Sequence, residues 1–131
     1  RDSNRGHIAR AALEGIAISV ATLAERAGEA LGHDLRELAV DEGAAATDPF
    51  LHAQADSTGL PVRRPRNLES TARGIALFAG VQCGLIPDLS AIADHREDDV
   101  QRFEPQINTE RRRHQRDRWN DAVNRSLGWH G

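Results

Sequence analysis

The stretch from Leu35 to Asp48 limits most strongly what this chain can fold into. Its short apolar run, Leu38 to Val40, is typical of a buried strand, and a glycine and three alanines then lead to Asp48 and Pro49. Proline is favoured in the first turn of a helix, so the stretch predicts a strand, a tight corner and a helix. Small residues at such a corner leave the backbone open to a flat ligand. On this stretch alone, an ordinary structural turn without a ligand is an equally good interpretation.

Helical and extended segments alternate along the rest of the chain. Apolar residues recur at three- to four-residue spacing from His7 to Leu31, which predicts a long helix capped by Asn4 or Ser3 and ended by Gly32. A second helix is expected to have Asp48 as its N-cap. The second and later helices are predicted at 48–57, 70–83, 88–94 and 108–126, and extended segments at 36–40, 60–65 and 100–105.

The order of these elements predicts an α/β fold that the chain does not complete by itself. A helix separates the strands at 36–40 and 60–65, so we expect these strands to be parallel, and parallel strands need cover on both faces. Two strands are too few to support that many apolar helices around one core. We therefore expect further strands upstream of residue 1, and a broad apolar surface where those strands belong.

Composition narrows the classes of function. With 131 residues and a net charge of −3, the chain suits one domain without a general affinity for polyanions. The arginine cluster at 111–118 is expected to be a solvated helix face paired with Glu110, Asp117 and Asp121, so no nucleic acid is expected as a partner. Cys83 is the single cysteine, which fits a reducing compartment. No run approaches the ~18 apolar residues of a membrane span, so the expected location is the cytoplasm.

Isolated polar and aromatic residues are expected to be structural. His7 borders the first helix, and the six histidines lack metal-ligand spacing. Glu14 is expected to tie the first helix to a nearby loop, with general-base work as the lesser alternative. Cys83 is expected to be buried at a helix end, and Trp119 and Trp129 are expected to pack against the domain.

Five blocks of sequence match, in order and at compatible spacing, the motifs of one family. The second block, Leu-Ala-Val-Asp-Glu-Gly-Ala-Ala-Ala-Thr-Asp, is similar to the family's LRVDGGAAAND, and the third is similar to QADLLGVPVERP. On these blocks the chain resembles, over nearly its whole length, the glycerol kinases of the FGGY carbohydrate kinase family. The blocks are residues 5–17, 38–48, 54–65 and 69–80, and the tail segments 102–105 and 119–129.

The resemblance implies a fold and a reaction. The fold is a partial RNase H-like (actin-like ATPase) domain with an α-β-α-β-α core and extra C-terminal helices. Residues 1–131 would be the C-terminal part of the family's second domain, with its first strands and the whole N-terminal domain absent. The family's reaction transfers a phosphoryl group from ATP, with Mg²⁺, to glycerol, giving sn-glycerol 3-phosphate. This chain would contribute the adenosine side of the nucleotide cleft.

The resemblance also implies which residues meet the nucleotide. Gly43 matches the second glycine of the family's DGG motif, and Ala44 and Thr47 complete the expected contact. Thr47 stands where the family usually has an asparagine, and Glu42 replaces the first glycine of the motif. Arg73 replaces a usual leucine on a helix that is expected to pack closely.

No catalytic residue of the family falls within this chain. The phosphate-binding hairpin, the catalytic aspartate and the glycerol-holding residues all precede it, so the chain alone is not expected to be active. The expected partners are ATP or ADP and, through the missing regions, glycerol or a related polyol, with a homo-oligomer left open. Two alternatives remain: a non-catalytic remnant or interaction module, favoured by Glu42 and Thr47, and a kinase of another polyol or sugar.

Overall fold

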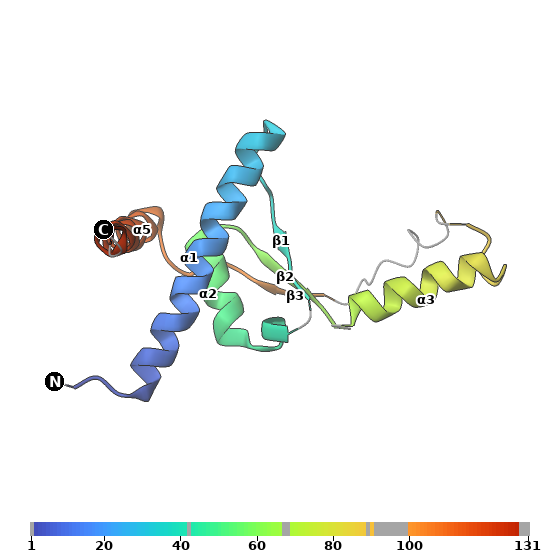
Figure 1. Cartoon of the computed structure of the whole chain (residues 1–131), viewed down its shortest axis with the longest axis horizontal. Helices are drawn as coiled ribbons and strands as arrows, with labels where there is room; N and C mark the ends of the chain where they lie inside the picture. Colours follow the sequence, from blue (N-terminus) through green and yellow to red (C-terminus); the bar gives the residue numbers. More distant parts are fainter. Residues whose placement is uncertain (1, 42, 67–68, 89, 91–99, 129–131) are drawn as a thin grey trace.

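The computed structural model describes residues 2–41, 43–66, 69–88, 90 and 100–128. The helix expected at 88–94 lies almost wholly outside these described residues. The elements, in chain order, are α1 (Arg5–Leu31), β1 (Leu38–Ala39), a short 3-10 turn (Gly43–Ala46), α2 (Asp48–Thr58), β2 (Val62–Pro65), α3 (Ser70–Gln82), β3 (Val100–Phe103) and α5 (Thr109–Ser126) (Figure 1).

The strands form one small mixed sheet with β2 at its centre. β1 pairs with β2 in parallel, as expected, and β3 pairs with β2 in the antiparallel direction. The extended segment at 100–105 therefore contains a third strand, which the count of two strands missed. Phe103 lies opposite Val62 in this pairing, and both side chains are buried. Burial of the facing pair stabilises β3 against the sheet.

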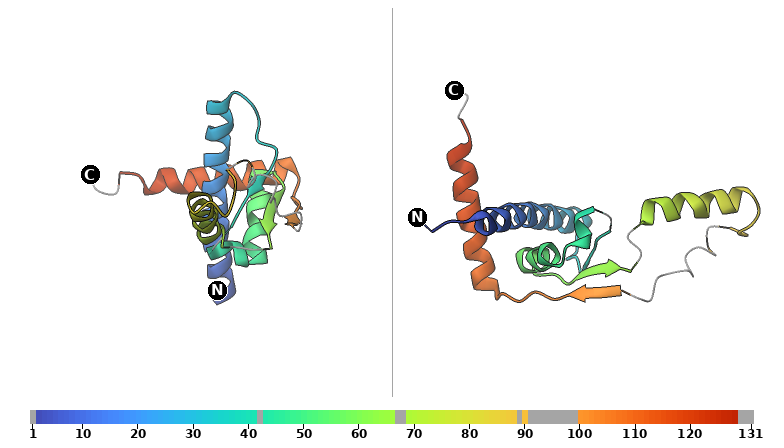
Figure 2. Two further views of the ribbon diagram at one scale, coloured as in Figure 1. Left: turned by 90° about the vertical axis from the view of Figure 1, so that its right-hand side faces the viewer. Right: turned by 90° about the horizontal axis from the view of Figure 1, so that it is seen from below.

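α1 and α2 run side by side over one face of this sheet (Figure 2). Asn4 and His7 cap the start of α1 through reciprocal hydrogen bonds, and Gly32 ends the helix at φ 74°. Ala17 and Ala21 are buried, and their small side chains let α1 approach α2 closely. The expected caps and the expected position of His7 are confirmed.

The hydrophobic core lies between α2 and the sheet. Leu51 and Val62 are its largest fully buried side chains, and Leu13 of α1 packs against the edge of the cluster. The core therefore joins α2 to the central strand. Its members are Ala45, Phe50, Leu51, Ala55, Val62 and Phe103.

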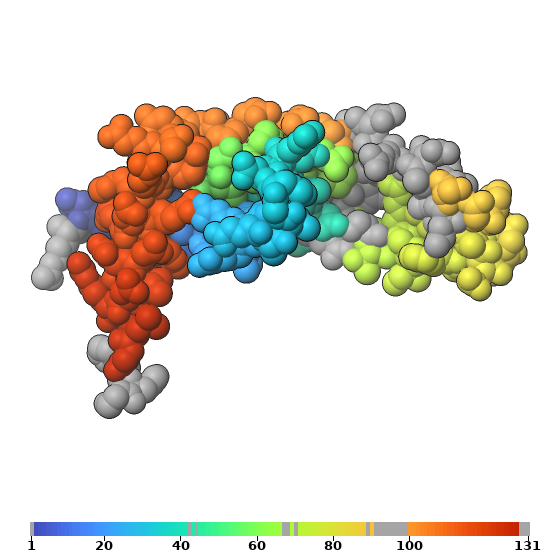
Figure 3. All heavy atoms as spheres, turned by 90° about the horizontal axis from the view of Figure 1, so that it is seen from above, coloured from blue at the N-terminus to red at the C-terminus, as the bar shows by residue number. Residues whose placement is uncertain are grey.

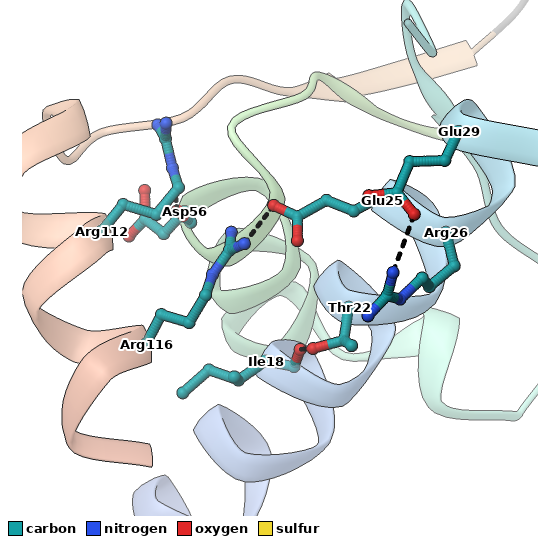
Figure 4. A network of polar contacts seen from close by, with 8 residues as sticks. All are labelled: Ile18, Thr22, Glu25, Arg26, Glu29, Asp56, Arg112 and Arg116. Atoms are coloured by element: carbon teal, nitrogen blue, oxygen red, sulfur yellow. Dashed lines mark hydrogen bonds and ion pairs between the residues drawn. The ribbon is translucent and has the colours of Figure 1, made fainter. Parts of the chain in front are cut away.

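Two arginines of α5 bind other elements (Figure 4). Arg112 donates from Nε to the Asp56 carbonyl oxygen at 2.8 Å, and Arg116 pairs with Glu25 of α1. The arginine cluster at 111–118 is thus not simply a solvated face with partners on its own helix. Arg112 also lies over Gly59, where an added Cβ atom would stand only 2.6 Å from the guanidinium carbon.

Trp119 provides the apolar part of the α5 contact. Its ring lies 3.1 Å from the position that a Cβ atom on Gly15 of α1 would occupy, so the expected packing of Trp119 is confirmed. Because Gly15 has no side chain, α5 can cross α1 at close range. Trp129 falls outside the described residues.

α3 stands apart from the rest of the described structure, at the opposite end from α5 (Figures 1 and 3). Ile75 and Phe78 on this helix are exposed. Within the part of the chain that the structure describes, the expectation that Arg73 lies on a closely packed helix is therefore wrong. Cys83 caps the C-terminal end of α3 and is exposed rather than buried. Closer packing would require a surface beyond the described sheet.

The outer side of α1 is apolar and open. Ile8, Ile16, Leu23 and Leu31 are each 53–70% exposed, although the helix buries alanines on its α2 side. By length and composition alone α1 is also apolar enough to cross a membrane, so the expectation that no segment reaches that threshold is wrong. A core helix passes the same test, and one such helix is weak evidence for a span.

Candidate functional site

The candidate site is the corner between β1 and α2. Two hydrogen bonds fix the strand that leads into it: Leu38 N–H donates to the Pro61 carbonyl at 2.9 Å, and Val40 N–H donates to the Arg63 carbonyl at 3.0 Å. The chain therefore leaves β1 along a line set by β2. Glu42, the residue before the corner, falls outside the described residues.

The corner is open on one side and anchored on the other. Gly43 is exposed at φ 41°, and an added Cβ atom there would meet no atom within 4 Å outside the two adjacent residues. Ala45, two residues later in the 3-10 turn, is only 4% exposed and belongs to the core. The backbone at Gly43 is thus accessible to a ligand, while the core holds the turn in place.

Thr47 occupies the N-cap position of α2. Its backbone is extended at φ −106° and ψ 104°, and its exposed side chain makes no capping hydrogen bond. The expectation of Asp48 as N-cap is therefore wrong by one residue, since Asp48 is already helical. The Thr47 carbonyl accepts from Phe50 N–H at 3.0 Å. Of the three predicted residues, Gly43 and Ala44 lie in the 3-10 turn and Thr47 directly follows it.

Arg64 of β2 binds this corner through its side chain. It is not among the residues predicted from the sequence. Its Nη1 donates to the Ala45 carbonyl at 2.9 Å, and its Nη2 lies 2.8 Å from Asp48 Oδ1 at the start of α2. Nη2 also donates to Gln101 Oε1 of β3 at 2.5 Å. One guanidinium thus joins the turn, the helix start and the neighbouring strand.

The surroundings of Arg64 keep its side chain in place. Its Cζ lies 5.0 Å from the centre of the Phe103 ring, over the ring face, and only 15% of its side chain is exposed. His52 of α2 meets the same ring edge-on, with centroids 5.1 Å apart. The sequence carried one signal: Arg64 shares the inward-facing side of its strand with Val62.

Two clefts lie elsewhere and involve none of the predicted site residues. One of about 410 Å³ lies between α1, α2 and α5, and another of about 830 Å³ lies beside the C-terminal half of α1. The smaller is lined by Arg10 and Glu14, which pair at 2.6 Å on α1. Glu14 therefore binds its own helix rather than a loop. Its hydrogen bond and its charge raise the pKa of Arg10 above the usual value.

The described residues contain no group of three or more His, Cys, Asp or Glu side chains that could hold a metal ion. The Mg²⁺ that the resemblance implies is expected to be bound mainly by residues outside this chain. The Asp48 carboxylate beside the corner is paired with Arg64, so it is not an isolated charge there.

Comparisons with known proteins assign the chain to a family. Residues 1–83 match the model of the FGGY family of carbohydrate kinases, C-terminal domain. The chain is 46% identical over 129 residues to a glycerol kinase of Citrifermentans bemidjiense, a match that covers 98% of this chain and 26% of that protein. It is 42% identical over 129 residues, with the same coverage, to a glycerol kinase of Deinococcus radiodurans.

A solved structure agrees with this assignment. The chain superposes on the crystal structure of Plasmodium falciparum glycerol kinase with ADP at a TM-score of 0.78 and 28% identity, over 96% of this chain and 25% of that one. The fold is accordingly part of an RNase H-like, actin-like ATPase domain, as expected. The chain spans about a quarter of the length of these relatives. It belongs to the FGGY family of carbohydrate kinases, whose C-terminal domain it matches.

Proposed function

We propose that this chain forms the adenosine side of the nucleotide cleft in an ATP-dependent glycerol kinase. The open corner at Gly43 is the observation that carries the proposal, because a flat ring can lie on a backbone from which no side chain projects. The reaction passes a phosphoryl group from ATP to a primary hydroxyl of glycerol, giving sn-glycerol 3-phosphate and ADP. The names of the relatives, and the ADP with which the superposed Plasmodium falciparum glycerol kinase was crystallised, support this assignment.

In this proposal the corner residues bind the adenosine, and the rest of the enzyme carries out the phosphoryl transfer. Gly43 and Ala44 offer their backbone to the adenosine, and Thr47 offers a side chain whose hydroxyl is not used for capping. The groups that hold Mg²⁺, the phosphates and glycerol belong to the remaining three quarters of the enzyme. The chain alone is therefore expected to lack kinase activity.

The proposal also says what covers α1. β1 lies at the edge of the described sheet, and the apolar residues Ile16 and Leu23 stand exposed on the outer side of α1. Strands from the preceding part of the same domain would extend the sheet past β1 and bury this side of the helix. Residues 1–131 are thus the C-terminal part of the second domain, without its first strands and without the N-terminal domain.

Location and other partners follow from the same proposal. We expect the enzyme in the cytoplasm, with ATP or ADP as partners and with neither nucleic acid nor membrane. The contacts of Arg112 and Arg116 support the absence of a nucleic-acid partner, because both arginines bind other elements of the fold instead of adding to a free basic face. α1 lies within the stretch that matches the family's C-terminal domain, which supports a role as a domain helix.

A chimera tests the proposal. Residues 1–131 would replace the matching quarter of the Citrifermentans bemidjiense glycerol kinase, and ATP-dependent phosphorylation of glycerol would be measured together with ADP binding by calorimetry. We expect an active chimera that binds ADP. A folded chimera that neither binds ADP nor phosphorylates glycerol would overturn the proposal and favour a non-catalytic remnant.

The substitutions at the corner give a second measurement on the same chimera. Glu42→Gly with Thr47→Asn restores the family's usual residues, and we expect ADP affinity to rise by about three- to tenfold, since one added hydrogen bond contributes roughly 1 kcal/mol. Thr22→Asn, at an exposed threonine of α1, is the matched control and is expected to leave affinity unchanged. Equal ADP affinity for the chimera, the double variant and the control would show that Glu42 and Thr47 do not affect nucleotide binding.

A further inference from the structure

We infer that Arg64 is a positioning residue for the nucleotide: it fixes the backbone of the Gly43–Ala46 turn that receives adenosine. The inference rests on the proposed function and assigns a role to a residue that lies outside the corner itself. Arg64 is on β2, 19 residues beyond Ala45 in sequence, and reaches the turn only through its side chain.

The geometry makes Arg64 the shared support of three elements. The fork of its guanidinium bonds the Ala45 carbonyl with one nitrogen, and with the other it bonds Asp48 and Gln101. Arginine suits this position because its donors have fixed relative directions, whereas lysine presents one compact charge. A change in the fork therefore changes the turn and the start of α2 together.

Arg64 acts through the turn, without a direct contact to the ligand. Its side chain is mostly buried, both terminal nitrogens already have partners, and its planar end lies over the Phe103 ring. Ala45 places its side chain in the core and its carbonyl on Arg64, which leaves the neighbouring Gly43 backbone free for a ligand.

Arg63 provides a matched control on the same strand. It is the adjacent residue, and its side chain pairs with Glu37 at 3.3 Å instead of reaching the turn. The side chains of Arg63 and Glu37 are each more than a third exposed. Arg63→Gln thus removes one arginine from β2 and leaves the contacts of Arg64 to the turn in place.

Amide NMR spectra of the chimera that carries residues 1–131, titrated with ADP and separately with adenosine, test the inference. For the natural sequence we expect both ligands to shift the amide signals of residues 43–47. For Arg64→Gln we expect both affinities to fall by the same factor, about tenfold, because a charged hydrogen bond to the turn is lost. Arg63→Gln is expected to stay within about twofold, since exposed ion pairs contribute little.

Arg64→Lys keeps the charge and protects the test against a simple loss of folding. Lysine can replace one bond of the fork but not both, so we expect an intermediate affinity with an unchanged fold. Affinities for Arg64→Gln and Arg64→Lys equal to that of the natural sequence would overturn the inference and leave the proposed function intact. Weaker ADP binding with unchanged adenosine binding would also overturn it, because Arg64 would then act on the phosphates.

The natural sequence separates the two proposals. If neither ligand shifts the signals of residues 43–47 in the unsubstituted chimera, the nucleotide site itself is wrong and the role of Arg64 falls with it. If the ligands bind there and only the Arg64 variants weaken them equally, both proposals stand.

Discussion

At the residue scale, two glycines with the same backbone conformation have different surroundings. Gly32 and Gly59 each end a helix at φ 74°. Nothing lies within 4 Å of a Cβ atom on Gly32, whereas a Cβ atom on Gly59 would stand 2.6 Å from the guanidinium carbon of Arg112. Gly59 is therefore required both by its left-handed backbone and by the approach of α5.

Gly59→Ala is predicted to destabilise the chain more than Gly32→Ala. Both substitutions force alanine into a left-handed conformation, which costs about 1–2 kcal/mol, and only the first also displaces Arg112 from the Asp56 carbonyl. Urea unfolding of the two variants measures the difference. In an Arg112→Ala background, where the bond to Asp56 is already absent, the two glycine substitutions should cost nearly the same unfolding free energy. Equal unfolding free energies for the two single variants would show that Arg112 moves aside at no cost.

The sequence predicted the local features of these residues better than their partners. Gly32 as a helix end and the Asn4 cap follow from short-range backbone chemistry, which a few neighbouring residues determine. Arg64 and Glu14 were misjudged or missed because their partners depend on side-chain direction and on which elements meet. Periodicity gives the burial of a position, but it does not name the atom across the interface.

At the element scale, Asp56 fastens α5 to the rest of the fold. Its carboxylate accepts from Gln106 N–H at 2.6 Å and from Ile107 N–H at 3.2 Å, just before α5 begins. Arg112 returns a bond from α5 to the backbone of the same residue. β3 and α5 follow one another, so this clamp also sets where the chain turns after the sheet.

Asp56→Ala is predicted to loosen α5 from α1. Two backbone N–H groups lose their acceptor, and the contact of Trp119 with Gly15 weakens as the helix moves away. In a Trp129→Phe background, which leaves Trp119 as the single tryptophan, the fluorescence maximum should shift to longer wavelength. Asp117→Ala, an exposed aspartate on α5, is the control. A spectrum that Asp56→Ala leaves unchanged would mean that Arg112, Arg116 and Trp119 hold α5 without the clamp.

The prediction of elements from sequence failed where pairing crosses long distances. The helices α1, α2, α3 and α5 were placed within a few residues, because each carries its own periodicity and caps. β3 was read as merely extended, since its partner β2 lies more than 30 residues earlier and its only strong anchor is Phe103. α3 is exposed because the sheet is small. The size of the sheet cannot be predicted from the sequence pattern of any single helix.

At the scale of the whole molecule, the described fold has an incomplete surface. β1 has a neighbour on one side only, and the apolar stripe of α1 formed by Ile8, Ile16, Leu23 and Leu31 is open. Contiguous exposed apolar surface of this kind marks an interface. In the proposed enzyme, the preceding strands of the same domain occupy it.

The isolated chain is therefore predicted to self-associate through the α1 stripe. Ile16→Glu with Leu23→Glu should weaken association by at least about tenfold, because the charges cannot be buried unpaired. Ala11→Glu is the control, because Ala11 points away from the stripe, about a third of a turn around the helix axis from both residues. This variant should have no such effect. Sedimentation reports the change. A natural sequence that sediments at the monomer mass of 14.4 kDa and melts cooperatively would contradict the prediction.

The most direct test of the central claim is photolabelling of the corner. The chimera with residues 1–131 would be irradiated with 2-azido-ADP, and the labelled peptide would be identified by mass spectrometry. We predict label within residues 43–47, removed by excess ATP. Label that ATP displaces but that maps to other parts of the chimera, with residues 43–47 unmodified, would contradict the assignment of this corner to adenosine.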